Sequence, residues 1–210
     1  GTPFGQSNLS NIATQGSRAN LRGVRIGTRG VFVQRSGERV YELFYNAEAG
    51  NYTPRELTLL HPDLAKDNPV VDIAVQRQPD TRIHFVLEDG TVAILTYEPE
   101  EELVCWSRVK TDTGTASAIE KVVVLPGENE DKVYYHVRRT INGATKRYLE
   151  KWAMESQCEG GDVCRLADSF KIFKDTGLTV DGFTHLAGDS GVIVWGDSGP
   201  VMNTTTDEPR

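Results

Sequence analysis

Two clusters of carboxylates are the residues of this chain best suited to acid–base or metal chemistry. They are Glu98-Pro-Glu-Glu-Glu102 and Gly127-Glu-Asn-Glu-Asp131. Paired carboxylates can cleave glycosidic bonds, and clustered oxygen ligands can bind Ca²⁺. Neither cluster has the Asp/Asn spacing of a calcium loop, and both fall between expected strands, where charged runs are normally solvated. We therefore expect no catalytic residue, no metal site and no cofactor there.

A serine motif is the second feature with catalytic potential. The segment Gly196-Asp-Ser-Gly-Pro-Val201 carries the Gly-Asp-Ser-Gly sequence in which trypsin-like proteases place their nucleophile beside an oxyanion hole. The second glycine before the proline is missing, and none of the four histidines lies in the Ala-Ala-His-Cys sequence of those enzymes. Gly188-Asp-Ser-Gly191 repeats the tetrapeptide, which indicates turn chemistry. Ser198 is therefore expected not to be catalytic.

Three cysteines complete the reactive side chains. Cys105 lies in the apolar run Leu103-Val-Cys-Trp106, which predicts a buried small hydrophobic residue. Cys158 and Cys164 bracket a Gly-rich loop, so that either free thiols or a local disulfide fit the sequence. No further ligands lie at the spacing that a zinc site needs.

Histidines and basic residues also fall on the expected strands. His84 and His136 take near-equivalent strand positions, where a structural hydrogen bond is the expected role. Arg138-Arg139 and Lys146-Arg147 form a basic cluster across the Asn142-Gly143 turn. This cluster predicts an exposed hairpin tip, with contact to a phosphate or an acidic neighbour as the alternative.

The elements that must position these residues repeat along the chain. Three hairpin-like segments align on Phe32, Phe85 and His136, at steps of 53 residues (32 to 85) and 51 residues (85 to 136). A period near fifty with strand–turn–strand units is typical of repetitive antiparallel β architecture. We therefore predict an all-β fold of antiparallel hairpin repeats, β-propeller-like but with too few blades for a closed propeller.

Alternating apolar residues predict the individual strands. The expected ranges are 21–26, 31–35, 40–45, 70–76, 82–87, 91–97, 103–109, 118–125, 132–139, 146–152 and 191–195. A short helix is predicted over Thr53–Leu60, because a Thr cap, a Pro and a Glu begin it. Trp106, Trp152 and Trp195 lie in apolar strand sequence and are expected in the core.

The organisation that follows has four parts. Residues 1–20 form a polar N-terminal segment, and residues 21–154 hold the propeller-like blades. Residues 155–182 are rich in Gly, Asp and Cys and predict a long loop, and residues 183–210 begin a second small β module. The polar ends and the first residue, Gly1, suggest a piece of a longer polypeptide.

Composition narrows the classes of function. The chain of 210 residues is 38% hydrophobic and 25% charged, which is typical of globular proteins and not of disordered ones. The formal net charge of −7 argues against broad phosphate binding, which needs a basic face. No apolar run approaches the roughly 20 residues of a membrane span.

Several segments resemble the large tail tubular, or nozzle, proteins of short-tailed bacteriophages and their prophage relatives. The resemblance covers about residues 17–199. The segments that carry it are Phe32-Val-Gln-Arg-Ser-Gly, Tyr41-Glu-Leu-Phe-Tyr45, Leu87-Glu-Asp-Gly-Thr-Val, Val104-Cys-Trp-Ser-Arg108, Arg138-Arg-Thr-Ile-Asn-Gly-Ala-Thr-Lys-Arg-Tyr-Leu-Glu150 and Asp175-Thr-Gly-Leu-Thr-Val-Asp-Gly182. His185-Leu-Ala-Gly and Val194-Trp-Gly-Asp resemble the start of a small β-barrel inserted in that family.

The resemblance implies a structural protein of the virion. It implies a propeller-bearing subunit that associates with itself in a ring, commonly of six copies, at the distal end of the tail and beside other tail proteins. Double-stranded DNA would pass through the central channel during ejection, and assembly would take place in the host cytoplasm. The resemblance transfers no catalytic role.

Two other classes of function stay open. The first is a propeller that binds a glycan or protein of the host surface, which aromatic residues clustered on one loop face would support. The second is a hydrolase, which would need an aligned partner for Ser198 or for a carboxylate pair.

Overall fold

The computed structural model describes residues 14–111, 117–141, 143–153, 192–196 and 199–204. Within these ranges the regular structure is β-strand, apart from one 3₁₀ turn, η2 (Pro99–Glu101). The predicted all-β fold is therefore confirmed.

The strands follow one another as hairpins, and each paired strand runs antiparallel to its neighbour. They are β1 (Val24–Ile26), β2 (Arg29–Val33), β3 (Val40–Asn46), β4 (Asn51–Glu56), β5 (Val70–Gln76), β6 (Arg82–Leu87), β7 (Val92–Glu98), β8 (Leu103–Val109), β9 (Ser117–Leu125), β10 (Lys132–Ile141), β11 (Ala144–Lys151), β12 (Val192–Gly196) and β13 (Gly199–Thr204).

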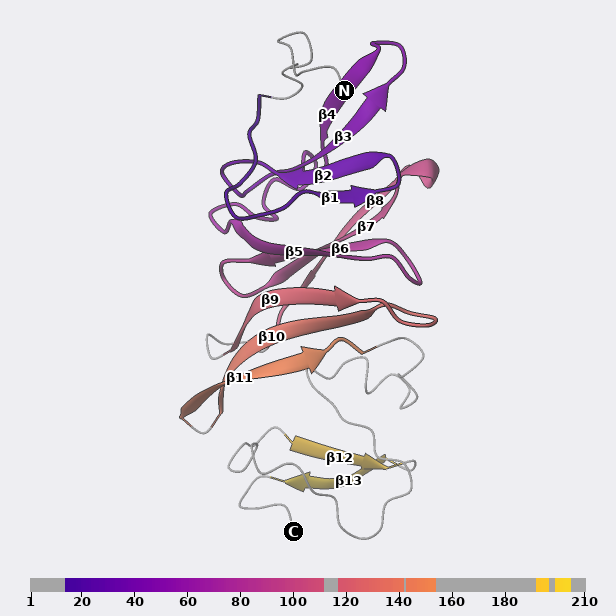
Figure 1. The fold of residues 1–210 in the computed structure, drawn as a ribbon. Coiled ribbons are helices and arrows are strands. Elements are labelled where there is room, and N and C mark those ends of the chain that lie inside the picture. Colours follow the sequence, from indigo (N-terminus) through magenta and orange to yellow (C-terminus); the bar gives the residue numbers. More distant parts are fainter. Residues whose placement is uncertain (1–13, 112–116, 142, 154–191, 197–198, 205–210) are drawn as a thin grey trace, which may run out of the picture.

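The strands form three stacked sheets and one separate hairpin (Figure 1). Sheet 1 has the order β1-β2-β3-β4, sheet 2 has β5-β6-β7-β8, and sheet 3 has β11-β10-β9. The first strands of sheets 2 and 3 lie beside each other, since β9 contacts β5. Sequential meanders stacked face to face are the arrangement of propeller blades, so the predicted hairpin repeats are confirmed as open, propeller-like sheets.

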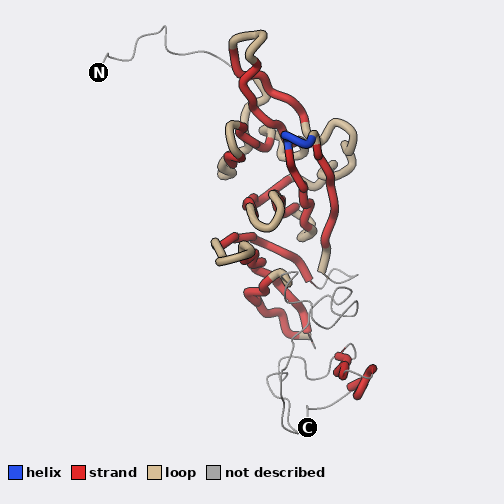
Figure 2. Tube along the Cα trace, turned by 90° about the vertical axis from the view of Figure 1, so that its right-hand side faces the viewer, coloured by secondary structure: helices blue, strands red, loops and turns tan. Residues whose placement is uncertain are grey.

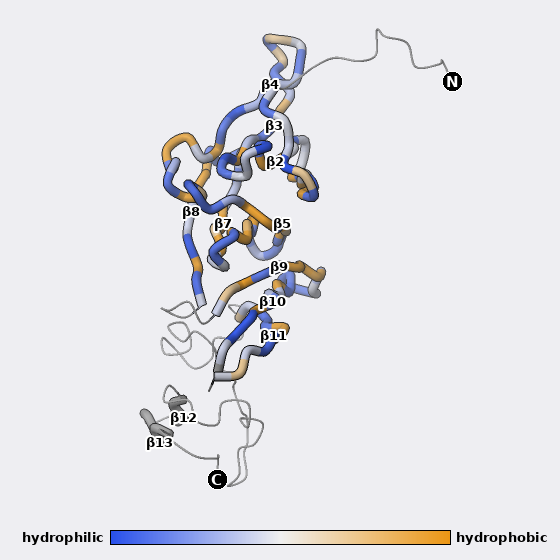
Figure 3. The backbone as a smooth tube through the Cα atoms, turned by 90° about the vertical axis from the view of Figure 1, so that its left-hand side faces the viewer, coloured by the Kyte–Doolittle hydropathy of each residue, from blue (hydrophilic) through white to orange (hydrophobic). Residues whose placement is uncertain are grey.

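Sheet 2 lies in the middle of the stack and is apolar on both faces. Along β6, Ile83 and Phe85 face sheet 1, whereas His84 and Val86 face sheet 3, because successive side chains alternate between the faces of a strand. This strand is almost wholly buried, although it includes Arg82 and His84. Its neighbour β5 appears largely in orange within the stack in Figure 3.

Two hydrophobic cores hold the stack together. The core between sheets 1 and 2 contains Val31, Val33, Val40, Leu57, Ala65, Val70, Ile83, Phe85, Leu87, Ala93, Leu95 and Tyr97. The core between sheets 2 and 3 contains Val86, Val92, Ile94, Ile119, Val122, Val133, Tyr135 and Val137. Each sheet therefore stabilises the next by burying one apolar face against it.

A glycine turn joins each sheet to the next. The hairpin turn between β2 and β3 contains Gly37, whose carbonyl accepts a hydrogen bond from the Val70 N–H at 2.9 Å. The turn between β6 and β7 contains Gly90, whose carbonyl accepts one from the Ile119 N–H at 3.0 Å. The two glycines lie 53 positions apart (37 to 90), which matches the first step of the sequence repeat.

The predicted helix over Thr53–Leu60 is wrong. Residues Asn51–Glu56 form β4, which pairs with β3 over its whole length. Pro54 lies opposite Leu43 and is tolerated because β4 is the edge strand of sheet 1. Cross-strand pairing with β3 therefore outweighs the local helix-start signals, and residues 57–60 form bends and turns. In Figure 2 the described part of the chain is strand or loop, apart from one short helical segment in blue.

The expectations for the tryptophans are confirmed where the structure describes them. Trp106 packs beside Phe85 with ring centroids 5.4 Å apart, and its Nε1 donates to the Leu57 carbonyl at 3.0 Å. Trp152 packs against the second core. The side chain of Trp195 and the predicted loop over residues 155–182 lie outside the described residues. The inserted β-barrel stays a prediction, since β12 and β13 are described only as a hairpin.

Replacing Gly90 tests the junction between sheets 2 and 3. Gly90 has φ +82°, and a Cβ at this position would lie 2.5 Å from the Cβ of Ala118. Gly90→Val should lower the free energy of unfolding in urea by about 1 kcal/mol from the backbone and by a further 1–3 kcal/mol or so from the clash.

Gly50→Val is the matched control for this experiment. Gly50 has φ +62°, but a Cβ there would meet nothing within 4 Å. The control should therefore show the backbone cost alone, of about 1 kcal/mol. Equal losses in the two variants would contradict close packing of the Gly90 turn against β9.

Candidate functional site

The two carboxylate clusters lie on turns, as predicted. Glu100 and Glu101 belong to η2 and are exposed. In the second cluster, Asp131 accepts a hydrogen bond from the Arg77 N–H at 2.7 Å and so links the β5–β6 turn to the β9–β10 loop. Among the described residues, no group of three or more His, Cys, Asp or Glu side chains could hold a metal ion.

The serine motif falls on the hairpin of β12 and β13. Gly196 and Gly199 pair at the closed end of this hairpin. Asp197, Ser198 and the upstream copy of the tetrapeptide lie outside the described residues, so the predicted absence of catalysis at Ser198 stays a prediction.

The prediction of a buried Cys105 is wrong, because this residue is exposed. Cys105 lies on β8, the edge strand of sheet 2, opposite Thr96 of β7. Its neighbours Val104 and Trp106 point inward and pack against the core instead. Cys158 and Cys164 lie outside the described residues.

The basic cluster at the β10–β11 hairpin is divided between the two faces of sheet 3. Arg138 and Arg147 pair across the strands, and both contact Glu120 on the face that points away from sheet 2. Arg139 instead contacts Glu150, with its Nη2 2.7 Å from Oε2. The three arginines of the cluster are therefore in ion pairs, and the alternation of side chains along β10 places Arg138 and Arg139 on opposite faces.

A buried carboxylate lies between sheets 1 and 2. Glu42 is 0% exposed and accepts a hydrogen bond from the Tyr97 hydroxyl. Arg29 Nη1 lies 3.1 Å from its Oε2, and Arg55 Nε contacts its Oε1. Burial and the neighbouring Glu42 raise the pKa of Tyr97 well above its usual range, so the phenol keeps its proton and donates. A buried charge is tolerated when it is paired in this way.

A buried histidine lies between sheets 2 and 3. The Nδ1 of His84 is 2.7 Å from the Tyr135 hydroxyl, and its Nε2 is 3.3 Å from Gln76 Oε1. The Gln76 amide nitrogen donates to the Gln78 carbonyl, which fixes the amide orientation. His84 therefore donates through Nε2 and accepts from Tyr135 at Nδ1, as a neutral imidazole. The predicted structural role of His84 is confirmed.

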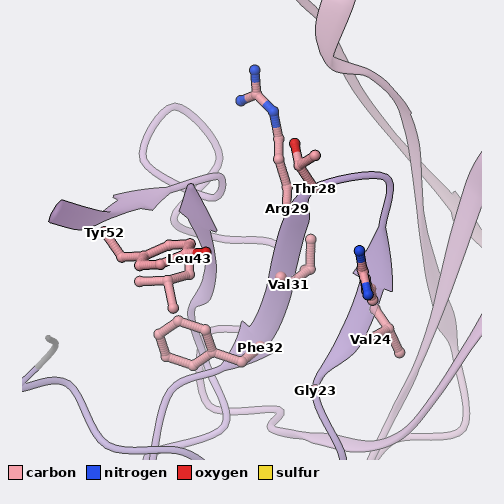
Figure 4. Close-up of a pocket in the computed structure, with 10 residues that line it drawn as sticks. Gly23, Val24, Thr28, Arg29, Val31, Phe32, Leu43 and Tyr52 are labelled. Carbon is pink, nitrogen blue, oxygen red and sulfur yellow. The ribbon is translucent and has the colours of Figure 1, made fainter. Parts of the chain in front are cut away.

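The outer face of sheet 1 carries an aromatic hollow of about 520 Å³. Figure 4 shows Phe32, Leu43 and Tyr52 gathered on one side of it, with Thr28 and Arg29 on the strand end nearby. Phe32 stacks on Tyr41 at 5.7 Å, and Tyr52 lies edge-on to Tyr45 at 5.5 Å. The hollow arises because Gly30, between Arg25 and Leu43 in the sheet, has no side chain.

The outer face of sheet 3 is the other end of the stack. Val123, Leu125 and Leu149 are exposed there, beside the ion pairs of Glu120. His136 Nδ1 lies 3.2 Å from Glu120 Oε2 on this face, so this histidine is half-exposed, unlike the buried His84. Sheets 1 and 3 therefore each have one face that no other described sheet covers.

The Glu42 cluster and the aromatic hollow were not predicted from the sequence. A signal for Glu42 exists, because it follows Val40 by two residues and so shares the buried face of β3. The hollow has a weaker signal, since a strand glycine marks a place where another backbone or a ligand can approach closely.

Comparison of the sequence with known proteins found no match that could assign a role to these surfaces. No protein-family model matches the chain, and no curated protein matches it. In the described part of the chain, no helix is long and apolar enough to cross a membrane.

The buried imidazole predicts a loss of stability in mild acid. Burial, with a smaller effect of Arg82, lowers the pKa of His84 to about 4 from 6.5. The unfolded chain therefore takes up a proton between pH 6.5 and 4 that the folded chain refuses. Stability is full above pH 6.5 and falls as the pH approaches 4, by on the order of 3 kcal/mol.

Urea unfolding at pH 7 and pH 4.5 measures this effect. Other carboxylates also titrate in this range, so the informative quantity is the difference between wild type and His84→Asn. The variant should lose less stability than wild type between the two pH values. An equal loss in both proteins would show that His84 is not the group responsible.

Proposed function

We propose that this protein is a structural subunit of the tail nozzle or tail tube of a short-tailed bacteriophage. In the virion it would associate with itself and with other tail proteins to form the conduit through which DNA is ejected. The observation that carries the proposal is the stack of repeated antiparallel sheets, which presents apolar side chains such as Tyr52 and Leu149 at its two ends. The family resemblance of the sequence supplies the virion and a ring commonly of six copies.

The charge of the chain supports a conduit that does not retain DNA. A net charge of −7 makes the subunit repel the phosphate backbone on average. The arginines of sheet 3 are already occupied, because Arg138 and Arg147 both contact Glu120. DNA could therefore pass such a surface without the long-lived contacts that free cations would make.

Mass measurement and imaging of the protein with its tail partners test this proposal. Native mass measurement followed by negative-stain imaging should show rings with a central hole. The protein should also be found in the tail of purified virions by antibody labelling. Absence from virions, or no channel-forming assembly with any tail protein, would contradict the proposal.

A second candidate function follows from the hollow on sheet 1. Aromatic rings with a few polar groups around a concavity are typical of sites that bind a sugar or a small ligand. Phe32 and Tyr52 supply the rings, and Arg25 and Thr28 supply the polar groups. The alternative function is therefore recognition of a host-surface glycan.

A glycan screen distinguishes the second candidate from the first. Tyr52→Ala should abolish binding of any glycan that the wild-type protein retains, because it removes one wall of the hollow. Leu60→Ala is the matched control, since Leu60 is highly exposed and does not line the hollow. Binding that survives Tyr52→Ala, or no binding by wild type, would rule out this site.

A further inference from the structure

We propose that the outer face of sheet 3 docks on the outer face of sheet 1 in a second copy of this chain, head to tail. The inference does not depend on the proposed function, because it concerns the free protein. The proposed contact between two copies is of the same kind as the contacts that join sheet 1 to sheet 2 and sheet 2 to sheet 3 within one chain.

The outer face of sheet 1 matches a face that sheet 2 buries. Cross-strand partners on the two faces correspond: Gly30 and Leu43 in sheet 1 take the places of Ile83 and Leu95 in sheet 2. By the same register, Phe32 takes the place of Phe85, which is fully buried against sheet 1. Gly30 leaves room where sheet 2 has the Ile83 side chain, and this room is the hollow.

The outer face of sheet 3 matches the other buried face of sheet 2. There His84 pairs with Ile94, and sheet 3 covers both. On sheet 3, His136 pairs with Leu149 on the corresponding face. Ile94 is 4% exposed, whereas Leu149 is 68% exposed. The same kind of pair is therefore covered on sheet 2 and left open, among the described residues, on sheet 3.

The backbone groups of the junction are also present at the two ends. Gly143 lies in the turn between β10 and β11, with φ +74° and open space around it, as Gly37 and Gly90 lie in the corresponding turns. Ser17 forms an isolated antiparallel bridge with Gln34. In the same way, Val70 pairs with Leu87, which lies 53 positions after Gln34 (34 to 87). Ser17 therefore takes the position of Val70, whose N–H donates to the Gly37 carbonyl.

The charged residues of sheet 3 are compatible with an aromatic partner. The hydrogen bond from Arg147, with a smaller effect of Arg138, lowers the pKa of the Glu120 carboxyl. The internal interface already combines arginine with an aromatic ring, since Arg29 and Arg55 lie 5.6 and 5.9 Å from the Phe44 ring. Arginines of one copy can contact the Tyr41 and Tyr52 rings of the next in the same way.

The number of sheets sets the expected stoichiometry. A heterologous interface produces a ring when the rotation closes and a fibre when it does not. Propellers typically have about four to eight blades. The described residues of each copy form three stacked sheets, so two such stacks joined at both ends give six sheets with two identical junctions.

Light scattering of the 210-residue protein after size exclusion tests the docking. Wild type should elute with twice the chain mass of 23.2 kDa at high concentration and dissociate on dilution. Leu149→Glu and Tyr52→Glu should each abolish the dimer, since each places a charge in the junction. Leu60→Glu is the control for an exposed apolar residue outside the two faces, and it should leave the dimer intact.

Mixing the two variants shows whether the contact is head to tail. Leu149→Glu keeps a normal sheet 1, and Tyr52→Glu keeps a normal sheet 3. An equimolar mixture should therefore regain a dimer through one intact junction, which a sheet 1 to sheet 1 contact would not do. A wild-type monomer at all concentrations, a dimer insensitive to both variants, or no recovery on mixing would each overturn the proposal. Circular dichroism of each variant excludes misfolding as the cause.

Discussion

The middle sheet needs a neighbour on each side, and the rest of the molecule depends on this constraint. Most antiparallel sheets have one apolar face and one solvated face. Sheet 2 differs because β6 buries Phe85 on one side and Val86 on the other. Burial of a large aliphatic or aromatic side chain contributes about 1.5–3 kcal/mol. Neither outer sheet can therefore be removed without exposing a large part of the apolar surface of sheet 2.

Each of the two interfaces contains a buried polar group whose hydrogen bond crosses from one sheet to the next. Glu42 needs Tyr97 from sheet 2, and His84 needs Tyr135 from sheet 3. Apolar faces alone tolerate sliding, because the hydrophobic effect has no direction. A misplaced sheet would lose the hydrogen bonds from Tyr97 to Glu42 and from Tyr135 to His84, although Arg29 and Arg55 would still pair with Glu42 within sheet 1. These residues therefore select the relative position of the sheets more than they add to stability.

Much of the strand pattern could be predicted, since it depends on local alternation. Val70–Gln76 and Leu103–Val109 were predicted with the bounds that the structure shows. The predictions failed where the position of a strand in its sheet, and not its own sequence, determines the structure. Pro54 fits a helix start in the sequence, but β3 recruits it to an edge strand. Cys105 lies among apolar residues, yet it is exposed because it belongs to the edge strand β8.

The candidate surfaces were harder to predict than the strands for a related reason. The hollow exists because Gly30 lies beside Leu43 and near Tyr52, which are separated from it in sequence and joined by pairing across three strands. The ion pairs of Glu120 likewise need the register of β9, β10 and β11. A strand can be recognised from its own residues, whereas a surface made by several strands needs their register.

The glycine junctions have a consequence for the order in which the chain folds. Gly37 and the four strands of sheet 1 precede Val70 in the sequence, so they leave the ribosome before Val70 does. The same holds for Gly90 and Ile119. Each sheet is a meander of neighbouring strands, so its contacts are local and form without waiting for distant sequence. The growing polypeptide can thus add one sheet at a time, each using its predecessor as a template, in the N-to-C direction of translation.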